Sequence, residues 1–229
     1  MNSRLAPGAL CALALLLTLG TPSAYATATR SAGTPVAVRA GTGSSLWLTG
    51  TSTLHDYESR TTETAVTMTR IPGSTQPAAA SLATLVRTST IRNIDVTVPV
   101  LSLHSPKKGV DKNLWKALKA SEHKNITVHL VSYTLSAKGT SRDTTALRAL
   151  GTITVAGVKQ PVTLEGRLYP GKGGMWLVGS HALLMSDFGI KPPKMMLGTL
   201  RVANPVTVHY KLLLVGRDGA VALSAAGAR

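Results

Sequence analysis

The sequence contains little cysteine, few aromatic residues and few acidic residues. Only one of its 229 residues is Cys, so neither a disulfide framework nor a cysteine-based zinc site is available. Aromatic residues make up 4%, which leaves few rings on which the bases of single-stranded nucleic acid stack. Lys and Arg number 25 against 10 Asp and Glu, giving a net charge of +15. We therefore expect a basic protein that does not bind nucleic acid.

Motifs of common enzyme classes are also missing. The chain contains no G-x-S-x-G, H-E-x-x-H, G-x-G-x-x-G or P-loop pattern. None of its six histidines stands four residues from another or beside a carboxylate cluster. The sequence thus predicts no catalysis, no metal site and no cofactor. One alternative is an enzyme that uses His55 and Asp56, which requires these groups to converge in one polar pocket.

The first 26 residues are typical of a secretory signal peptide. Arg4 precedes an uncharged apolar run from Ala9 to Leu19, and Ala24-Tyr25-Ala26 matches a cleavage site. The run is shorter than the roughly 20 residues that span a membrane. We expect cleavage after Ala26, removal of the single Cys with the signal, and export to the periplasm or the medium.

The rest of the chain is predicted to form one domain between flexible ends. Residues 27–45 are rich in Thr, Ala, Gly and Ser and are predicted to be a flexible leader. Residues 46–216 are predicted to fold, with order beginning near Ser44. Residues 217–229 are rich in Ala and Gly and are predicted to be a disordered tail.

Apolar residues recur with period two, which predicts half-buried strands. In the last run, Val206, Val208 and Tyr210 alternate with Thr207 and His209. About eight runs rich in Val, Thr, Ile or Leu qualify as strands: 46–54, 63–71, 82–103, 126–135, 147–155, 162–168, 175–184 and 206–214.

Two glycine-bearing connections and one helix complete the prediction. Residues 156–159 and 170–174 lie between consecutive runs and contain the glycines that tight hairpins require, so neighbouring strands are expected to pair antiparallel. Residues 111–121 predict a short amphipathic helix capped by Asp111, with Leu114 and Leu118 on its apolar face.

Eight antiparallel strands with one helix form either a barrel or a β-sandwich. A barrel removes the exposed sheet edges and leaves room for side chains or one ligand. In one run, Ile126, Val128 and Leu130 are apolar on one face, and residues 131–135 are apolar at every second position on the other. We interpret apolar residues on both faces as favouring the barrel.

Four blocks of sequence, taken in order, resemble the YceI-like family. They are GTSTLHDYE at 50–58, DKNLWKALK at 111–119, GVKQPV at 157–162 and SDFGIKPP at 186–193, followed by MLGTLRV at 196–202. The resemblance covers about residues 46–215. It implies an exported, extended eight-stranded antiparallel barrel, lipocalin-like, that takes a polyisoprenoid or other long amphiphile. The chain departs from the family pattern at Asn204-Pro205, where an acidic residue is common, and in its few aromatic residues.

From the resemblance and the alternation together, we predict a non-catalytic carrier that sequesters an isoprenoid-type lipid, such as a polyprenyl chain or an isoprenoid quinone. Which face of each strand points inward stays open, because a shift of one residue inverts a strand. Phe188 is predicted either to plug one end of the barrel or to line the ligand mouth. The predicted ligand-binding residues are Leu48, Ile126, Val128, Leu130, Val162, Leu164, Val178, Phe188, Ile190, Val206, Val208, Tyr210 and Leu212.

The basic residues are concentrated around the predicted helix, and this concentration suggests an alternative function. Two interpretations stay open: an approach surface for an anionic membrane or head group, and an ordinary solvated helix face, which is the more common of the two. The alternative function is a binding module for anionic polymers such as lipopolysaccharide or polysaccharide, with a solid barrel. No feature of the sequence indicates an oligomeric state. The lysines concerned are Lys107, Lys108, Lys112, Lys116 and Lys119, with Lys191 and Lys194 in a second loop.

Overall fold

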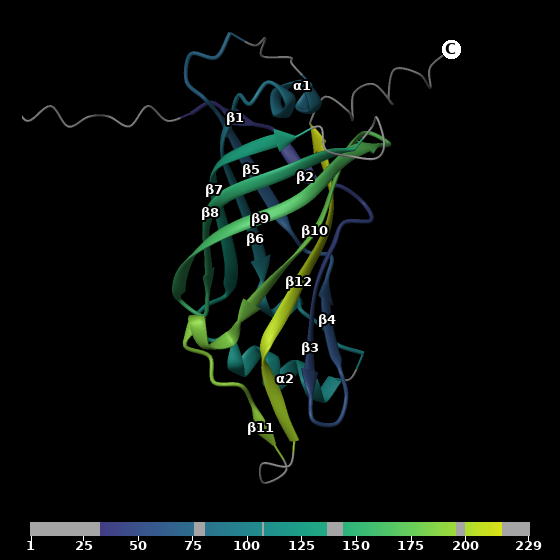
Figure 1. Cartoon of the computed structure of the whole chain (residues 1–229), viewed down its shortest axis with the longest axis vertical. Coiled ribbons are helices and arrows are strands. Elements are labelled where there is room, and N and C mark those ends of the chain that lie inside the picture. Colours follow the sequence, from purple (N-terminus) through teal and green to yellow (C-terminus); the bar gives the residue numbers. More distant parts are fainter. Residues whose placement is uncertain (1–32, 76–80, 107, 137–143, 196–199, 217–229) are drawn as a thin grey trace, which may run out of the picture. The chain divides into compact units, whose positions relative to one another are not determined.

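The computed structural model describes residues 33–75, 81–106, 108–136, 144–195 and 200–216 (Figure 1). These residues belong to one compact unit, Ala32–Arg229. The predicted signal peptide, the predicted tail and Lys107 lie outside the described residues. Within the described ranges, no helix combines the length and the apolar character needed to cross a membrane.

The described residues form mainly β-strands. The strands are β1 (Pro35–Val36), β2 (Val38–Ala40), β3 (Ser45–Ser52), β4 (Tyr57–Thr61), β5 (Ala65–Arg70), β6 (Ile91–Pro99), β7 (Asn125–Ser136), β8 (Thr145–Val155), β9 (Val158–Gly171), β10 (Gly174–Leu184), β11 (Lys194–Met195) and β12 (Leu200–Gly216). The helices are α1 (Leu82–Arg87), α2 (Lys108–Ala117) and the 3₁₀ turns η1 (Val100–Ser102) and η2 (Met185–Phe188).

The strands make one antiparallel sheet that curls on itself (Figure 1). Strands β5 to β10 are successive neighbours, β12 follows β10, and the β3–β4 hairpin lies beyond β12. At one end, β2 pairs with β12 and contacts β5. At the other end, the backbones of Arg60 and His104 exchange two hydrogen bonds of 2.8 and 3.0 Å. These links bring the sheet edges together, and the predicted all-β antiparallel barrel is confirmed.

The eight predicted runs correspond to β3, β5 to β10 and β12, and the short strands β1, β2, β4 and β11 are additional. Strands β1 and β2 fall within the stretch predicted as a leader, so strands begin at Pro35 rather than near Ser44. The predicted hairpin between β8 and β9 is a two-residue turn, because Val155 pairs with Val158. Ala156 and Gly157 have φ of 49° and 82°, which is the conformation that tight hairpins require.

The long strand predicted over 82–103 is wrong in its first part, where the chain forms α1. Ser81 caps this helix by accepting a hydrogen bond from the Thr84 N–H at 3.2 Å. Leu82, Leu85 and Val86 are buried, a spacing of three and four residues that belongs to a helix and not to a strand. Strand β6 begins only at Ile91 and ends at Pro99, where the predicted bend lies.

Helix α2 is present but begins at Lys108, before the predicted cap. Asp111 lies inside the helix rather than at its start, and its side chain is buried. Its carboxylate accepts a hydrogen bond of 2.7 Å from the Ser105 N–H and contacts His104 Nδ1 at 3.1 Å. Trp115 Nε1 donates to the Leu103 carbonyl at 3.0 Å. These bonds fix α2 against the loop that follows η1.

Strand β7 contains a bulge that changes which of its apolar residues point into the barrel. Its register with β8 shifts between Leu130 and Ser132, and Val131 is left 51% exposed. A bulge inserts one extra residue and so inverts the alternation beyond it. Tyr133 and Leu135 therefore pack against the core, on the same side as Ile126 and Leu130. The two apolar faces inferred from the sequence are one inward face, which corrects that part of the argument for a barrel.

Candidate functional site

The interior of the barrel holds two adjoining cavities with apolar walls. The α1-end cavity has a volume of about 110 Å³ and reaches Val86 of α1. The α2-end cavity has a volume of about 140 Å³ and reaches Leu114 of α2. The two spaces meet, because six residues line both: Leu46, Val96, Val128, Ile153, Leu183 and Val208. We call this shared ring the waist.

Most of the residues predicted to bind a ligand line these cavities. Both cavities draw on successive inward positions of β7 and β12. Lining the α1-end cavity are Val128, Leu130, Leu164, Val208, Tyr210 and Leu212. Lining the α2-end cavity are Leu48, Ile126, Val128, Phe188, Ile190, Val206 and Val208.

Two predicted residues lie elsewhere. Val178 lies over an outer groove together with Trp47 and His209, so its inward assignment is wrong. The residues of β10 that line the α1-end cavity are at odd-numbered positions: Met175, Leu177, His181 and Leu183. Val162 is buried in the core of the barrel but lines neither cavity.

Several further residues line the cavities but are absent from the set predicted from the sequence. Val66 and Met68 of β5 line the α1-end cavity and alternate with polar residues, so the period-two signal was present. Tyr133 of β7 lines the cavity although the alternation predicts it on the opposite face, because the bulge is not visible in the sequence. His181 stands two residues from the inward Leu183, which places it on the inward face of β10.

The polar groups of the α1-end cavity are few. Tyr133 donates its hydroxyl to the Val86 carbonyl at 2.9 Å and so ties β7 to α1. Tyr210 donates its hydroxyl to the Glu165 carbonyl at 2.7 Å. Burial, and secondarily the charge of Glu165, raise the pKa of Tyr210 to about 12. Burial also raises the pKa of Tyr133 above its usual value of 10.0. Both phenols are therefore neutral donors at physiological pH.

The Tyr210 hydrogen bond fills a break in the sheet. The β9–β10 ladder ends at the pair Gly166 and Gly179, and Glu165 is the next residue of β9. A Cβ atom on Gly179 would overlap the Tyr210 hydroxyl, so the absence of a side chain there admits the ring. The phenol thus satisfies a backbone carbonyl at the point where the two strands separate.

Replacing Tyr210 with Phe is expected to lower the free energy of unfolding by about 1–3 kcal/mol, because the Glu165 carbonyl loses its donor. Urea denaturation measures the change. Tyr169→Phe is the matched control, since the Tyr169 hydroxyl has no hydrogen bond within the described part of the chain. Equal destabilisation by the two substitutions would contradict this role of Tyr210.

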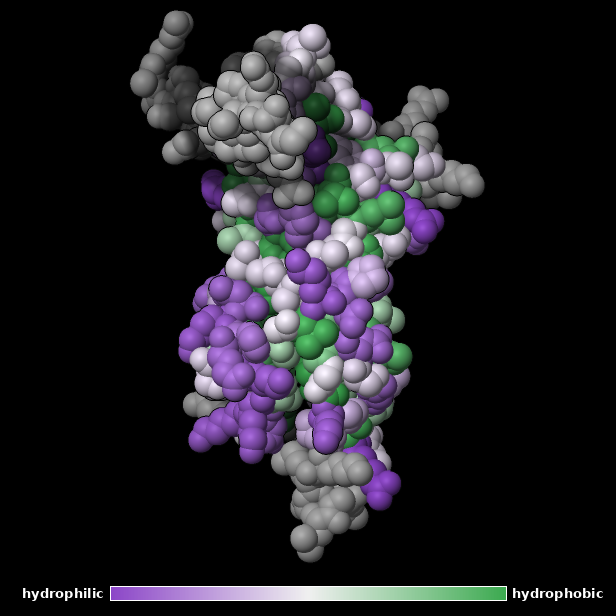
Figure 2. Space-filling view, turned by 90° about the vertical axis from the view of Figure 1, so that its left-hand side faces the viewer, coloured by the Kyte–Doolittle hydropathy of each residue, from purple (hydrophilic) through white to green (hydrophobic). Residues whose placement is uncertain are grey.

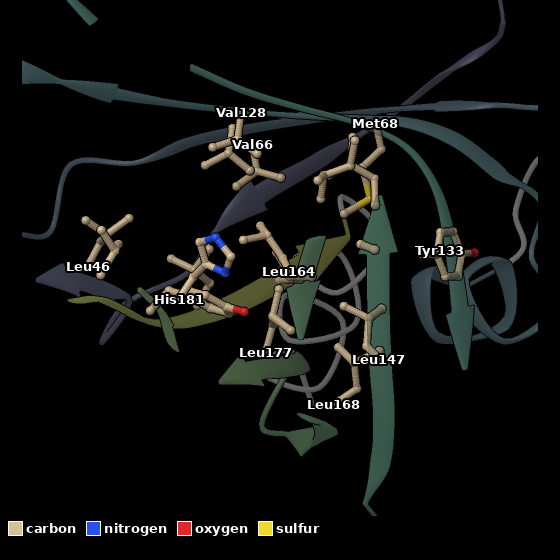
Figure 3. Close-up of a pocket in the computed structure, with 18 of the residues that line it drawn as sticks. Leu46, Val66, Met68, Val128, Tyr133, Leu147, Leu164, Leu168, Leu177 and His181 are labelled. Atoms are coloured by element: carbon tan, nitrogen blue, oxygen red, sulfur yellow. The ribbon is translucent and has the colours of Figure 1, made fainter. Parts of the chain in front are cut away.

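His181 is the third polar side chain of the α1-end cavity and points into it (Figure 3). Burial lowers its pKa from the usual 6.5, and the nearby charge of Glu165 opposes this shift. The imidazole is therefore neutral at physiological pH and carries one donor nitrogen and one acceptor nitrogen.

A surface groove of about 380 Å³ adjoins the α2-end cavity. It lies between α2, the β3–β4 hairpin and the segment after η2, and it shares Tyr57, Leu114, Ala117 and Met185 with that cavity. Its other lining residues include Val110 and Val202. The interior thus comes close to the surface at the α2 end.

Phe188 and its neighbours close this end of the barrel. Phe188 is 3% exposed and lines the α2-end cavity, so it both plugs the barrel and faces its interior. Gln160 Nε2 donates to the Asp187 carbonyl at 2.6 Å. The Asn204 amide accepts from the Ser186 N–H and donates to the Ser186 hydroxyl, each at 2.9 Å. Asn204, at which the chain departs from the family pattern, therefore joins β12 to η2 through these two hydrogen bonds.

The outer surface is mixed in polarity. In Figure 2, hydrophilic residues cover much of the lower part of the visible face, with hydrophobic residues between them. Lys112 and Lys116 are exposed on α2, as predicted for its polar face, and Lys119 is exposed just beyond the end of the helix. Lys191 is also exposed. The side chains of Lys108 and Lys194, like Lys107, lie outside the described residues.

The residues of the enzyme alternative lie in the β3–β4 turn. His55 and Asp56 are both exposed, and the Ser52 hydroxyl donates to the His55 carbonyl at 2.7 Å. His55 borders the surface groove among Ser, Asn and apolar residues. Among the described residues, no three His, Cys, Asp or Glu side chains form a group able to hold a metal ion.

Comparison with known proteins adds a family and a fold. A family model described as the YceI-like domain matches residues 37–214. Burkholderia cenocepacia BcnA is similar in structure, with a TM-score of 0.56, 14% identity, and coverage of 75% of this chain and 96% of that one. A polyisoprenoid-binding domain from Saccharophagus degradans, implicated in plant cell wall breakdown, gives a TM-score of 0.55, 9% identity, and coverage of 79% and 99%. No curated protein matches the sequence significantly.

Proposed function

Because this chain belongs to the YceI-like family, we propose that it is an exported, non-catalytic carrier that holds the apolar chain of a polyisoprenoid or similar long amphiphile inside its barrel. The observation that carries the proposal is the pair of adjoining apolar cavities that meet at the waist. The structural similarity to a polyisoprenoid-binding domain supports the same class of ligand.

The size of the cavities sets the length of chain that fits without movement of the walls. A water-sized group needs about 10–15 Å³ of such cavity volume. Cavities of about 110 and 140 Å³ therefore hold on the order of twenty methylene-sized groups. A longer chain requires the walls to move apart or the chain to continue into the groove beside α2.

Burial of such a chain supplies enough free energy for retention. At about 0.3 kcal/mol per heavy atom, twenty carbons contribute about 6 kcal/mol. That free energy corresponds to a dissociation constant of tens of micromolar. Each further isoprene unit that the barrel accepts tightens binding, and no chemical step is needed for this role.

The charged exterior fits a protein that meets anionic surfaces. Lys112 and Lys116 lie exposed on α2, and Lys119 lies exposed in the turn that follows it, next to the groove at which the interior approaches the surface. Each basic residue close to an anionic membrane contributes about 1 kcal/mol at low salt. We propose that α2 faces the membrane or head group from which the chain is taken.

Native mass spectrometry and lipid extraction of the protein purified from its own host test this function. A co-purifying isoprenoid lipid that survives washing at high salt is the expected result, because burial of an apolar chain is insensitive to ionic strength. A polyanion-binding module would instead lose its ligand steeply as salt rises. Absence of bound lipid together with failure to bind added isoprenoids would refute the carrier function.

A further inference from the structure

His181 is the one polar side chain of the α1-end cavity that has no partner within the described residues. The other two polar side chains of its lining, Tyr133 and Tyr210, donate their hydroxyls to backbone carbonyls. The imidazole of His181 makes neither a hydrogen bond nor an ion pair with any described residue. A polar group that faces an apolar space with no partner is unfavourable, so such groups in native proteins call for an explanation.

The position of His181 is next to the waist. It pairs with Val208 of β12, and Val208 and the inward neighbour Leu183 both belong to the waist. The β9–β10 ladder has already ended at Gly179, so this part of β10 has no β9 partner. Figure 3 shows the ring among Leu46, Leu164 and Leu177, aimed at the centre of the space. A chain that runs through both cavities passes this ring.

The chemistry of the site selects an uncharged oxygen. Burial keeps the imidazole neutral at physiological pH, so it offers a donor to a carbonyl or a hydroxyl oxygen and an acceptor to a hydroxyl hydrogen. A carboxylate or phosphate in the same place would be desolvated among leucine and valine side chains, and the described lining of this cavity contains no Lys or Arg, so such a ligand is strongly unfavourable. Lys211, which pairs with Val178 of β10, is exposed on the outer face.

We propose that His181 determines ligand specificity by hydrogen-bonding a hydroxyl or carbonyl oxygen of the bound chain at the waist. The inference rests on the carrier function proposed above and deepens it. The barrel then distinguishes an oxygen-bearing isoprenoid from a hydrocarbon of the same skeleton. The α1-end cavity, with room for on the order of ten methylene-sized groups, receives the chain on one side of that oxygen.

The test compares two probes that share one C15 skeleton, farnesol with its hydroxyl and β-farnesene without oxygen. Their affinities are measured at pH 7.5 by displacement of an apolar fluorescent dye from the mature protein. His181→Leu removes both ring nitrogens and keeps an apolar side chain of moderate size. It is expected to weaken farnesol binding about tenfold, the value of one neutral hydrogen bond, and to leave β-farnesene binding unchanged or tighter.

Two variants and one spectroscopic measurement make the result specific. His181→Gln keeps a donor and an acceptor and is expected to retain most of the preference for farnesol. His129→Leu removes an imidazole from the outer face of β7, where it contacts Asp95, and is expected to change neither affinity. In the wild-type protein, the ¹⁵N NMR signals of the His181 ring are expected to shift when farnesol binds and not when β-farnesene binds. This measurement does not depend on the folding of any variant.

The inference is overturned if His181→Leu lowers the affinity for both probes equally, because His181 then has only a packing role. It is also overturned if neither affinity changes, because trapped water then already satisfies the ring. If the wild-type protein binds both probes but without preference, only the inference fails. If it binds neither probe, the carrier function fails and the inference with it.

Discussion

Replacing Ala149 with Phe is expected to weaken binding of isoprenoid lipid about thirtyfold while the protein stays folded. Ala149 of β8 is fully buried and lines the α1-end cavity. The six carbons of the added ring occupy space that about six carbons of the ligand would fill, and at about 0.3 kcal/mol per carbon this removes about 2 kcal/mol of binding free energy. The existing cavity accepts the ring, so the usual penalty of overpacking is reduced.

The matched control is Ala146→Phe, on the outer face of the same strand. Ala146 borders the outer groove and pairs with Arg167. It is expected to leave lipid affinity unchanged within about twofold. Affinity is measured by dye displacement, and folding by thermal melting in the absence of lipid. Undiminished binding in Ala149→Phe, with the melting temperature of the wild type, would show that the ligand does not occupy the α1-end cavity.

Replacing Phe188 with Ala is expected to lower the free energy of unfolding by about 3–5 kcal/mol, the usual effect of truncating a buried Phe. The side chain is 3% exposed and closes the α2 end of the barrel. Lipid affinity is expected to stay the same or to rise, because the lost ring enlarges the α2-end cavity for the ligand. Urea denaturation in the absence and the presence of lipid measures both effects.

Leu54→Ala is a suitable control for this substitution. Leu54 is 65% exposed in the β3–β4 turn, so its truncation is expected to change stability by less than about 0.5 kcal/mol. Lipid should stabilise Phe188→Ala at least as much as it stabilises the wild type, since a ligand stabilises in proportion to the logarithm of its concentration over the dissociation constant. Loss of lipid binding with little loss of stability would instead assign Phe188 to the ligand mouth alone.

The lowered pKa of His181 predicts that the stability of the protein depends on pH. Its pKa is lowered in the folded protein from 6.5, so the unfolded chain binds the proton more readily. The free energy of unfolding therefore rises with pH between the lowered pKa of the folded protein and about 6.5, the pKa of an unperturbed histidine. Above about 6.5 it levels off. His181→Leu should remove this part of the pH dependence, which the difference in melting temperature between the two proteins at several pH values reveals. Tyr133 and Tyr210 face the same cavity and stay neutral throughout.

Much of the fold could be predicted because its signals are local. The alternation in β12 and the glycine in the β8–β9 turn depend on residues a few positions apart, and both are found in the structure as predicted. The error over α1 had a different origin. Leu82, Leu85 and Val86 read equally well as part of an apolar strand until their burial on one side is known. Short apolar runs carry this ambiguity between strand and helix.

The residues of the site were less predictable, because pairing with neighbouring strands decides which side chains of a strand point into the barrel. On β10, Met175, Trp176, Leu177 and Val178 are all apolar, so alternation alone gives no inward side. The pairing of Leu177 with Leu212 and of Val178 with Lys211 settles it in favour of Leu177. On β7, the bulge at Val131 reverses the facing halfway along the strand.

The sequence by itself determined the all-β class, most of the strands, the family and the apolar character of the lining, because period two, turn glycines and sequence blocks are properties of the chain alone. Only the tertiary structure decided that the interior holds two cavities that meet at a waist, and that His181 rather than Val178 faces them. The reason is physical. A cavity is the space left between strands, and its boundary depends on register, bulges and the separation of β9 from β10, which no single stretch of sequence contains.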